Sequence, residues 1–317
     1  MRTSPLRWLI AVAFLLQLFP ATGRAQPMTS WSVGPTMPFA GSQMLAIAGD
    51  DGSIYLFGGY RNNGQVSADA WRFDLVTGNY TQLTSMSSAR RGACGDRLPD
   101  GRLMVVGGYN NGPVLTAVIY DTHTDVWTPA GSVTGGWECS ANTGADGLLH
   151  VFGGESNTTS HDVYDPGTDS WSAGQWMPTQ RKIHGSAMAD DGRFFVFGGE
   201  ISQTTDVFDP QTQVWAQISN LPNSNMQFGW AGDGERMFVL GGSTSYGNDG
   251  APYYDVVWYA DTITGVWQVD SEVLPVAARE TTAAVVDGVI YLFGGSNGNK
   301  LDVVQVGVYA ADQDEDG

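Results

Sequence analysis

Residues 191 to 215 read DGRFFVFGGEISQTTDVFDPQTQVW, and this stretch decides the fold. It opens on an Asp-Gly pair, continues through the apolar run 194–197 and reaches the doublet Gly198-Gly199. Phe208-Asp209 follows, and Trp215 lies seven residues after Phe208. Short runs of β-branched and aromatic residues bounded by Gly and Asp are typical of strands joined by tight turns. The stretch therefore predicts a strand hairpin followed by further antiparallel strands.

The same pattern occurs six times along the chain of 317 residues. Each occurrence contains a Gly-Gly doublet that ends an apolar run, and successive doublets lie 43 to 53 residues apart. The doublets are Gly58-Gly59, Gly107-Gly108, Gly153-Gly154, Gly198-Gly199, Gly241-Gly242 and Gly294-Gly295. Repeats of this period indicate a propeller or a solenoid. A composition with 42 Gly, 11 Trp and 12 Tyr also favours many short strands.

Each repeat carries the signals of up to four strands. An Asp-Gly pair precedes each apolar run, and we expect a hairpin there with positive φ at both central residues, as a type I′ turn requires. An aromatic-Asp pair ends the third strand and a Trp begins the fourth, as at Tyr120-Asp121 with Trp127 and Tyr164-Asp165 with Trp171. We expect these large aromatic side chains to pack between neighbouring repeats.

The sixth repeat lacks its Trp-containing strand, and a matching stretch is found at the other end of the chain. Residues 29–38 read TSWSVGPTMP and match residues 169–178, DSWSAGQWMP, at six of ten positions. We therefore predict an all-β fold: a six-bladed propeller with four antiparallel strands per blade, closed into a ring by the N-terminal strand that contains Trp31. Such closure leaves no free sheet edge.

Four strands per repeat, the Gly-Gly doublet and the aromatic-Asp…Trp pattern resemble the kelch repeat, and the resemblance covers residues 29 to about 311. The Gly-His…Trp-Asp signature of WD-type propellers does not occur in the sequence. The resemblance implies that residues 26–311 form one kelch-type propeller.

Residues 1–25 have the pattern of an export signal. Arginines stand at positions 2 and 7, an apolar run broken only by Gln17 covers 8–19, and small residues stand at 21, 23 and 25. The run is too short to span a bilayer comfortably. We therefore expect a secreted or periplasmic protein with no membrane span after cleavage.

Residues 312–317 form either an acidic tail or the truncated start of a calcium-binding repeat. Asp312, Asp314 and Asp316 are followed by Gly317, which matches the first half of a calcium loop.

The chain is strongly acidic, with a formal net charge of −18. Loss of residues 1–25 would change this to −21, because three arginines and no acid would be removed. Such a charge repels phosphate backbones, so we exclude nucleic acid as a partner.

The two cysteines, Cys94 and Cys139, fall on the innermost strands of neighbouring blades. Export permits a disulfide between them. Their offsets within the repeat differ by one residue, however, which would point them to opposite faces of a strand. A disulfide and two buried free thiols both remain open.

The loops between the second and third strands, and those between blades, should emerge on one face. They vary in length and content, as at Ser243 to Tyr254, and variable loops on a rigid scaffold usually carry function. The candidate ligand-binding residues lie just before the innermost strands, where they would ring the channel mouth: Arg90, Trp137, Glu138, Arg181, His184, Arg279 and Glu280. Aromatic rings stack on sugars, and Arg binds a carboxylate through two hydrogen bonds. The alternative is that the Arg and Glu side chains pair with each other and tie the blades together.

The leading hypothesis is a monomeric extracellular binding module without a cofactor, which presents its loop face to a glycan or protein ligand. Some exported kelch propellers act on sialic acid as epimerases, so a sugar-acid isomerase is one alternative, with Glu138 and Glu280 as acid and base. We assign no catalytic residue on this resemblance alone. A scaffold domain of a longer surface protein is the other alternative. Kelch-type copper oxidases need two His at the channel, and only His184 of the four His is expected there, so we predict no metal site.

Overall fold

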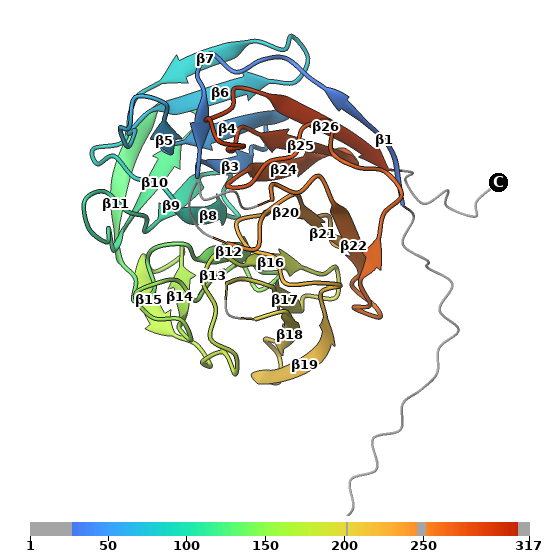
Figure 1. The fold of residues 1–317 in the computed structure, drawn as a ribbon. Helices are drawn as coiled ribbons and strands as arrows, with labels where there is room; N and C mark the ends of the chain where they lie inside the picture. Colours follow the sequence, from blue (N-terminus) through green and yellow to red (C-terminus); the bar gives the residue numbers. More distant parts are fainter. Residues whose placement is uncertain (1–26, 201, 246–251, 310–317) are drawn as a thin grey trace, which may run out of the picture.

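The computed structural model describes residues 27–200, 202–245 and 252–309. The predicted signal segment 1–25, the acidic tail 312–317 and residues 246–251 of the long loop lie outside the described residues. The described residues form six four-stranded antiparallel sheets that surround a common centre, with one two-stranded sheet in addition (Figure 1). The fold is therefore the predicted all-β, six-bladed propeller.

Three blades come from the first half of the chain. Their strands, from the centre outward, are β3 (Leu45–Ala48), β4 (Ser53–Phe57), β6 (Ala70–Asp74) and β7 (Tyr80–Leu83); β8 (Cys94–Arg97), β9 (Leu103–Val106), β10 (Thr116–Asp121) and β11 (Val126–Ser132); and β12 (Ser140–Thr143), β13 (Leu149–Phe152), β14 (His161–Asp165) and β15 (Ser170–Ala173).

The other three blades follow in the same order. Their strands are β16 (Gly185–Met188), β17 (Phe194–Phe197), β18 (Thr204–Asp209) and β19 (Val214–Asn220); β20 (Gly229–Gly232), β21 (Arg236–Leu240), β22 (Val257–Asp261) and β23 (Gln268–Val269); and β24 (Thr282–Val286), β25 (Val289–Phe293), β26 (Val304–Tyr309) and β1 (Met28–Val33). The short strands β2 (Gly41–Ser42) and β5 (Tyr60–Arg61) pair separately near the first blade.

The outer strand of the sixth blade comes from the N-terminal part of the chain. Strand β1 pairs antiparallel with β26, and Trp31 lies opposite Gly307 in this ladder. Because β26 also pairs with β25, segments from both ends of the described chain share one sheet.

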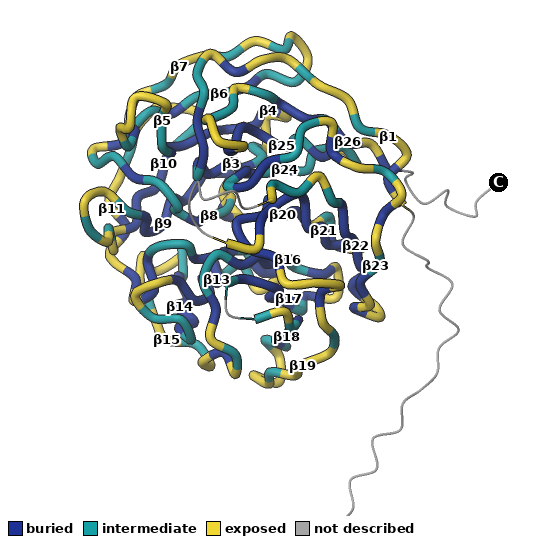
Figure 2. The backbone as a smooth tube through the Cα atoms, in the orientation of Figure 1, coloured by how far each residue is buried: buried dark blue, intermediate teal, exposed yellow. Residues whose placement is uncertain are grey.

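The apolar runs that precede the Gly-Gly doublets form the second strand of each blade and carry much of the core. Strands β4, β9, β13, β17 and β21 are buried at every residue. The outer strands are mostly exposed, so burial decreases from the centre to the rim (Figure 2). The doublets themselves must be glycine: Gly107 has a φ of 67°, and a Cβ there would lie 1.6 Å from the Gly136 carbonyl oxygen.

The Trp residues that begin the outer strands pack between blades, as predicted. The indole N–H of Trp215 donates to the Gln175 carbonyl oxygen at 2.9 Å, and that of Trp267 donates to the Thr205 hydroxyl at 2.8 Å. Trp127 and Trp171 make the corresponding bonds to the blades before them. Each of these bonds joins the outer strand of one blade to the preceding blade.

The Asp-Gly pairs do lie in hairpin turns, but the predicted turn type is wrong for most of them. Both residues have positive φ only at Asp287 (49°) and Gly288 (73°), among the described hairpins. In the second blade the Leu98 N–H instead bonds the Arg102 carbonyl oxygen, and only Gly101 is left-handed. This is a three-residue loop in which a turn is followed by one left-handed residue.

Cys94 and Cys139 form a disulfide, with their Cα atoms 5.5 Å apart. It joins the innermost segments of the second and third blades. The one-residue offset does not prevent it, because Cys139 precedes β12 and is therefore not bound by the alternation of side chains along a strand.

Candidate functional site

Six residues with left-handed backbone surround the central channel, one from each blade. They stand directly before the innermost segments, and their φ values lie between 52° and 59°. We name this set the throat ring: Gln43, Gly92, Glu138, Ile183, Gln227 and Glu280. Left-handed backbone is costly for residues other than glycine and persists only where the surrounding structure fixes it.

Backbone hydrogen bonds fix the throat ring. The N–H groups of five ring residues donate to the carbonyl oxygen of the ring residue in the preceding blade, at 2.5 to 3.0 Å. The donors are Gln43, Gly92, Glu138, Ile183 and Glu280. The left-handed backbone thus directs these five N–H groups along the ring, each toward the preceding blade.

The throat ring lies between two cavities. Four of its residues line both of them: Gln43, Glu138, Gln227 and Glu280. The first, which we name the mouth cavity, has a volume of about 580 Å³ and opens on the loop face. The second, the channel cavity, has a volume of about 240 Å³ and lies among the innermost strands.

Loops from several blades converge on the mouth cavity, as the sequence predicts. Its lining comes from the segments before the innermost strands and from the loops after the Gly-Gly doublets: Gln43, Tyr60, Arg61, Asn62, Gly64, Arg91, Trp137, Glu138, Glu155, Lys182, Gln227, Arg279, Glu280, Ser296, Gly298, Asn299 and Lys300. Five of these residues are basic and three are acidic. Two of the basic residues, Arg61 and Lys182, also pair with Asp69 and Glu200, which do not line the cavity.

Arg91 stands among three aromatic rings at the mouth. Its guanidinium lies 5.0 Å from the ring centre of Tyr109, 5.4 Å from that of Tyr60 and 5.6 Å from that of Trp137. Tyr109 and Trp137 contact each other with ring centres 4.5 Å apart, and Arg91 also donates to the Gln43 side chain. Contacts of this kind hold a cation without neutralising it.

Glu280 is an ionised carboxylate with several partners. It accepts hydrogen bonds from the Ser42 hydroxyl at 2.7 Å and from Lys300 at 2.8 Å. Burial alone would raise the pKa of Glu280, but Lys300, Ser42 and Arg279 together lower it.

Glu138 occupies the same ring position with the opposite electrostatic result. Burial, aided by the negative charge of Glu155, raises the pKa of Glu138 to about 7. The positive charges of Lys182 and Arg91 oppose this shift without cancelling it, and the Lys182 ammonium group pairs with Glu155 and with Glu200. Glu138 therefore exchanges a proton near neutral pH.

The structure places four of the seven candidate residues at the mouth cavity: Trp137, Glu138, Arg279 and Glu280. It does not place Arg90 or Arg181 there. The Arg90 guanidinium is buried and donates to the Gly107 and Thr116 carbonyl oxygens. Arg181 is likewise buried, donates to the Gly198 carbonyl oxygen at 2.8 Å and pairs with Asp206 at 2.9 Å. Both arginines have a structural role, but each guanidinium binds strands of its own blade and neither pairs with a Glu of another blade, which the alternative had proposed.

His184 also lies inside the fold rather than at the mouth. Its Nε2 atom lies 2.9 Å from the Ser140 hydroxyl of the neighbouring blade. Burial, with the nearby positive charge of Arg181, lowers the pKa of His184 to about 3. It is therefore a neutral core residue.

The principal residues missing from the candidate set are Arg91, Lys182 and Lys300. Arg91 and Lys182 each follow a buried arginine of the candidate set directly in the sequence, so in both cases the prediction missed the mouth residue by one position. Lys300 comes from the loop after the last doublet, and only the fold brings it to Glu280.

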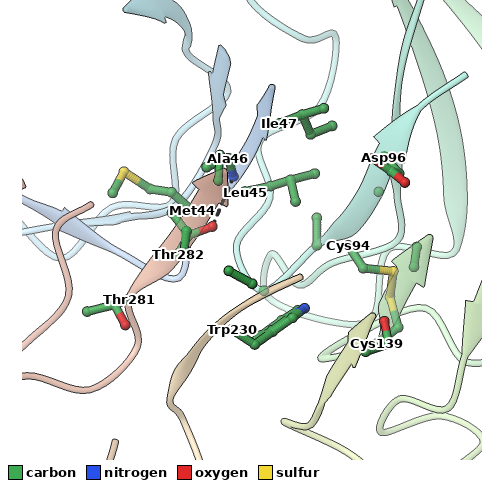
Figure 3. Close-up of a pocket in the computed structure, with 18 of the residues that line it drawn as sticks. Met44, Leu45, Ala46, Ile47, Cys94, Asp96, Cys139, Trp230, Thr281 and Thr282 are labelled. Carbon is green, nitrogen blue, oxygen red and sulfur yellow. Dashed lines mark hydrogen bonds between the residues drawn. A yellow bond between two sulfur atoms is a disulfide. The ribbon is translucent and has the colours of Figure 1, made fainter. Parts of the chain in front are cut away.

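The channel cavity has a different chemistry from the mouth. One residue from the middle of each innermost strand faces it: Ala46, Gly95, Ala141, Ser186, Trp230 and Ala283. Figure 3 shows Trp230 between the strand that carries Thr282 and the Cys94–Cys139 disulfide in that view, with Leu45 and Ile47 on another side. The walls are therefore mostly apolar.

The described residues hold no group of three or more His, Cys, Asp or Glu side chains arranged to bind a metal ion. Within the same residues, no helix has the length and hydrophobicity that a membrane crossing requires.

Two family models match the chain. The KLHDC2/KLHL20/DRC7 Kelch-repeats domain matches residues 136–312, and the Kelch motif matches residues 44–87. The first match covers more than half of the chain.

Curated relatives match shorter parts of the chain. F-box/kelch-repeat protein At1g22040 of Arabidopsis thaliana is 34% identical over 102 residues, which is 31% of this chain and 20% of that protein. Beta-scruin of Limulus polyphemus is 28% identical over 166 residues, 47% of this chain and 18% of that protein. F-box/kelch-repeat protein At1g67480 of Arabidopsis thaliana is 32% identical over 149 residues, 43% of this chain and 39% of that protein. The matches thus span only a fifth to two fifths of these relatives' own lengths.

Proposed function

Because the chain belongs to the kelch-repeat propeller family, we propose that it is an exported binding module whose mouth cavity receives a segment of a partner protein. The observation that carries this proposal is the convergence of loops from several blades on one cavity of about 580 Å³. A rigid ring that positions variable loops is the usual arrangement of a binding surface.

Buried polar atoms without partners support a ligand at this place. Arg279 and Gln227 line the mouth cavity, and each carries a buried atom, Nε and Oε1, that has no hydrogen-bond partner in the described part of the chain. The same holds for Trp137 Nε1 and Arg61 Nη1. Unpaired buried donors and acceptors are costly, and a polar ligand would satisfy them.

Export is supported by the Cys94–Cys139 disulfide, because such bonds persist in oxidising compartments. The apolar pattern of residues 8–19 points the same way. Secretion or a periplasmic location is therefore part of the proposal.

A glycan is the second candidate ligand, and the Tyr109–Trp137 pair favours it. Its aromatic faces stand beside Arg91 at the mouth, where a sugar ring could stack while hydroxyl groups bond the unpaired donors. This candidate differs from the first in ligand only, since both use the same residues.

The test is a parallel screen of the exported protein against a displayed library of random peptides and an array of purified glycans. Arg91→Ala and Trp137→Ala are the site variants. Val76→Ser is the matched control, since Val76 is 95% exposed in the turn between β6 and β7, away from the mouth.

We expect the screen to enrich peptides that bind the unaltered protein. Either site variant should bind these peptides with an affinity lower by roughly tenfold or more. The control should bind unchanged. Binding of glycans but no peptides would replace the first candidate by the second. Binding that all three variants retain, or no binding in either arm, would overturn the mouth cavity as the site.

A further inference from the structure

The channel cavity below the throat ring carries an inference separate from the proposed partner at the mouth. At the middle register of the innermost strands, five blades contribute small residues, which are Ala46, Gly95, Ala141, Ser186 and Ala283. The fifth blade contributes Trp230 at the same register, opposite Val239. One indole therefore stands in a space that five small side chains leave open.

Trp230 is only partly buried although its strand neighbours Gly229 and Ala231 are buried. Its indole lines the channel cavity together with aliphatic side chains, as Figure 3 shows for Leu45 and Ile47. A flat aromatic surface facing an apolar cavity is poorly solvated by water and is well suited to stack on another ring.

Three residues that line this cavity each carry a buried polar atom that has no hydrogen-bond partner within the described residues. These atoms are Ser186 Oγ, Thr281 Oγ1 and Asn142 Oδ1. Ser186 is 2% exposed and Thr281 is 5% exposed, so bulk water does not cover them. Hydroxyl groups accept or donate, and an amide oxygen accepts, so a ligand with a hydrogen-bond donor would satisfy one of them after a rotation of that side chain toward the cavity.

The size and lining of the cavity limit the ligand. An apolar cavity of about 150 Å³ holds one benzene molecule. The channel cavity, at about 240 Å³, has room for one or two fused rings. Most residues that line the channel cavity are apolar or small, as in ligand sites that fix a molecule with a few placed polar groups. Its acidic side chains are Asp96 and, at the throat ring, Glu138 and Glu280, and they disfavour an anionic ligand.

We propose that the channel cavity binds a small uncharged aromatic molecule of one or two rings, which carries a hydrogen-bond donor and lies against the Trp230 indole.

The test uses indole and p-cresol as probes, with toluene as a ring that lacks a donor. Binding to the intact exported protein is measured by calorimetry and by saturation-transfer NMR. Ala283→Leu fills the cavity from the sixth blade, Trp230→Ala removes the aromatic face, and Ser186→Ala removes one hydroxyl. Trp176→Ala is the matched control, because Trp176 is 64% exposed and does not line the cavity.

We expect saturable binding of indole and p-cresol, weaker binding of toluene, and at least a tenfold loss of affinity in Ala283→Leu with an unchanged melting temperature. Trp230→Ala should also bind the probes with lower affinity. Ser186→Ala should reduce the difference in affinity between p-cresol and toluene. The control Trp176→Ala should bind the probes with the affinity of the unaltered protein. The proposal is overturned if neither donor-bearing probe binds saturably, or if a folded Ala283→Leu protein binds them as well as the unaltered one.

Discussion

Glu138 and Glu280 stand at the same position of the repeat, three blades apart in a ring of six, and their carboxyl groups are held in opposite states. Burial raises the pKa of Glu138 to about 7. Lys300 and Ser42 lower that of Glu280 in spite of its burial. The backbone geometry is thus shared, and the difference comes from the loop side chains that each ring position meets.

The raised pKa of Glu138 predicts a specific pH dependence of stability. The unfolded chain releases this proton near the ordinary pKa of 4.5 and the folded chain releases it near 7, so stability falls as pH rises between these values. The free energy of unfolding of Glu138→Gln should not show this loss. Relative to the unaltered protein, the variant should therefore be roughly 1–3 kcal/mol more stable at pH 8 than it is at pH 4. Urea denaturation of both proteins across this range measures it. A variant whose stability follows the same pH curve as the unaltered protein would contradict the assignment.

Arg181 should be required for folding stability rather than for ligand binding. Arg181→Met leaves Asp206, which is fully buried, without its ion-pair partner, and we expect a loss of about 3–5 kcal/mol. The double variant Arg181→Met, Asp206→Leu should recover much of this loss, because no charge is left unpaired. Chemical denaturation of the two variants distinguishes the outcomes. Equal stability of the single and double variants would show that the pair is not coupled.

The disulfide should contribute about 2–4 kcal/mol, since it closes a loop of 45 residues. The double variant Cys94→Ala, Cys139→Ala should lose this amount under oxidising conditions. It should also be insensitive to dithiothreitol, whereas the unaltered protein should lose stability when reduced. Thermal melts with and without reductant make the comparison. Two titratable thiols in the oxidised, unfolded protein would refute the bond.

Two inter-blade tryptophans should differ in what their indole N–H contributes. Trp267→Phe leaves the buried Thr205 hydroxyl without its donor, and we expect a cost of about 1–3 kcal/mol for that group in addition to lost packing. Trp215→Phe removes an exposed hydrogen bond, so water can take the place of the indole N–H at the Gln175 carbonyl oxygen and the cost should be smaller. The free energies of unfolding of the two variants test this order. Adding Thr205→Val to Trp267→Phe should reduce the extra destabilisation of Trp267→Phe, because no unpaired hydroxyl is left. An unchanged destabilisation would contradict the role given to the Thr205 hydroxyl.

The repeat and its markers were enough to predict the fold, because each marker is a local signal that occurs in several blades. The Gly-Gly doublets and the Trp residues at the outer strands occupy the places predicted for them. The turn type at Asp51-Gly52 was not predictable in the same way. The pair is compatible with two- and three-residue loops, and the residues around it decide between them.

The site was predictable as a region but not residue by residue. Arg90 and Arg91 are adjacent, and one enters the blade while the other faces the mouth. Both arginines precede a throat-ring residue, and the throat ring has no common residue type that would mark this place in the sequence: Gln43, Gly92, Glu138, Ile183, Gln227 and Glu280 occupy it. The position is set by hydrogen bonds between blades, which a single repeat does not contain.

The pairing of β1 with β26 determines how the molecule would respond to mechanical force. Met28 lies opposite Tyr309 in this antiparallel ladder, so the two points from which the chain would be pulled stand at the same end of the same pair of strands. Tension between them would open the ladder one hydrogen bond at a time from Met28 toward Val33, instead of loading all the bonds together in shear. The propeller should therefore be mechanically weakest at this seam.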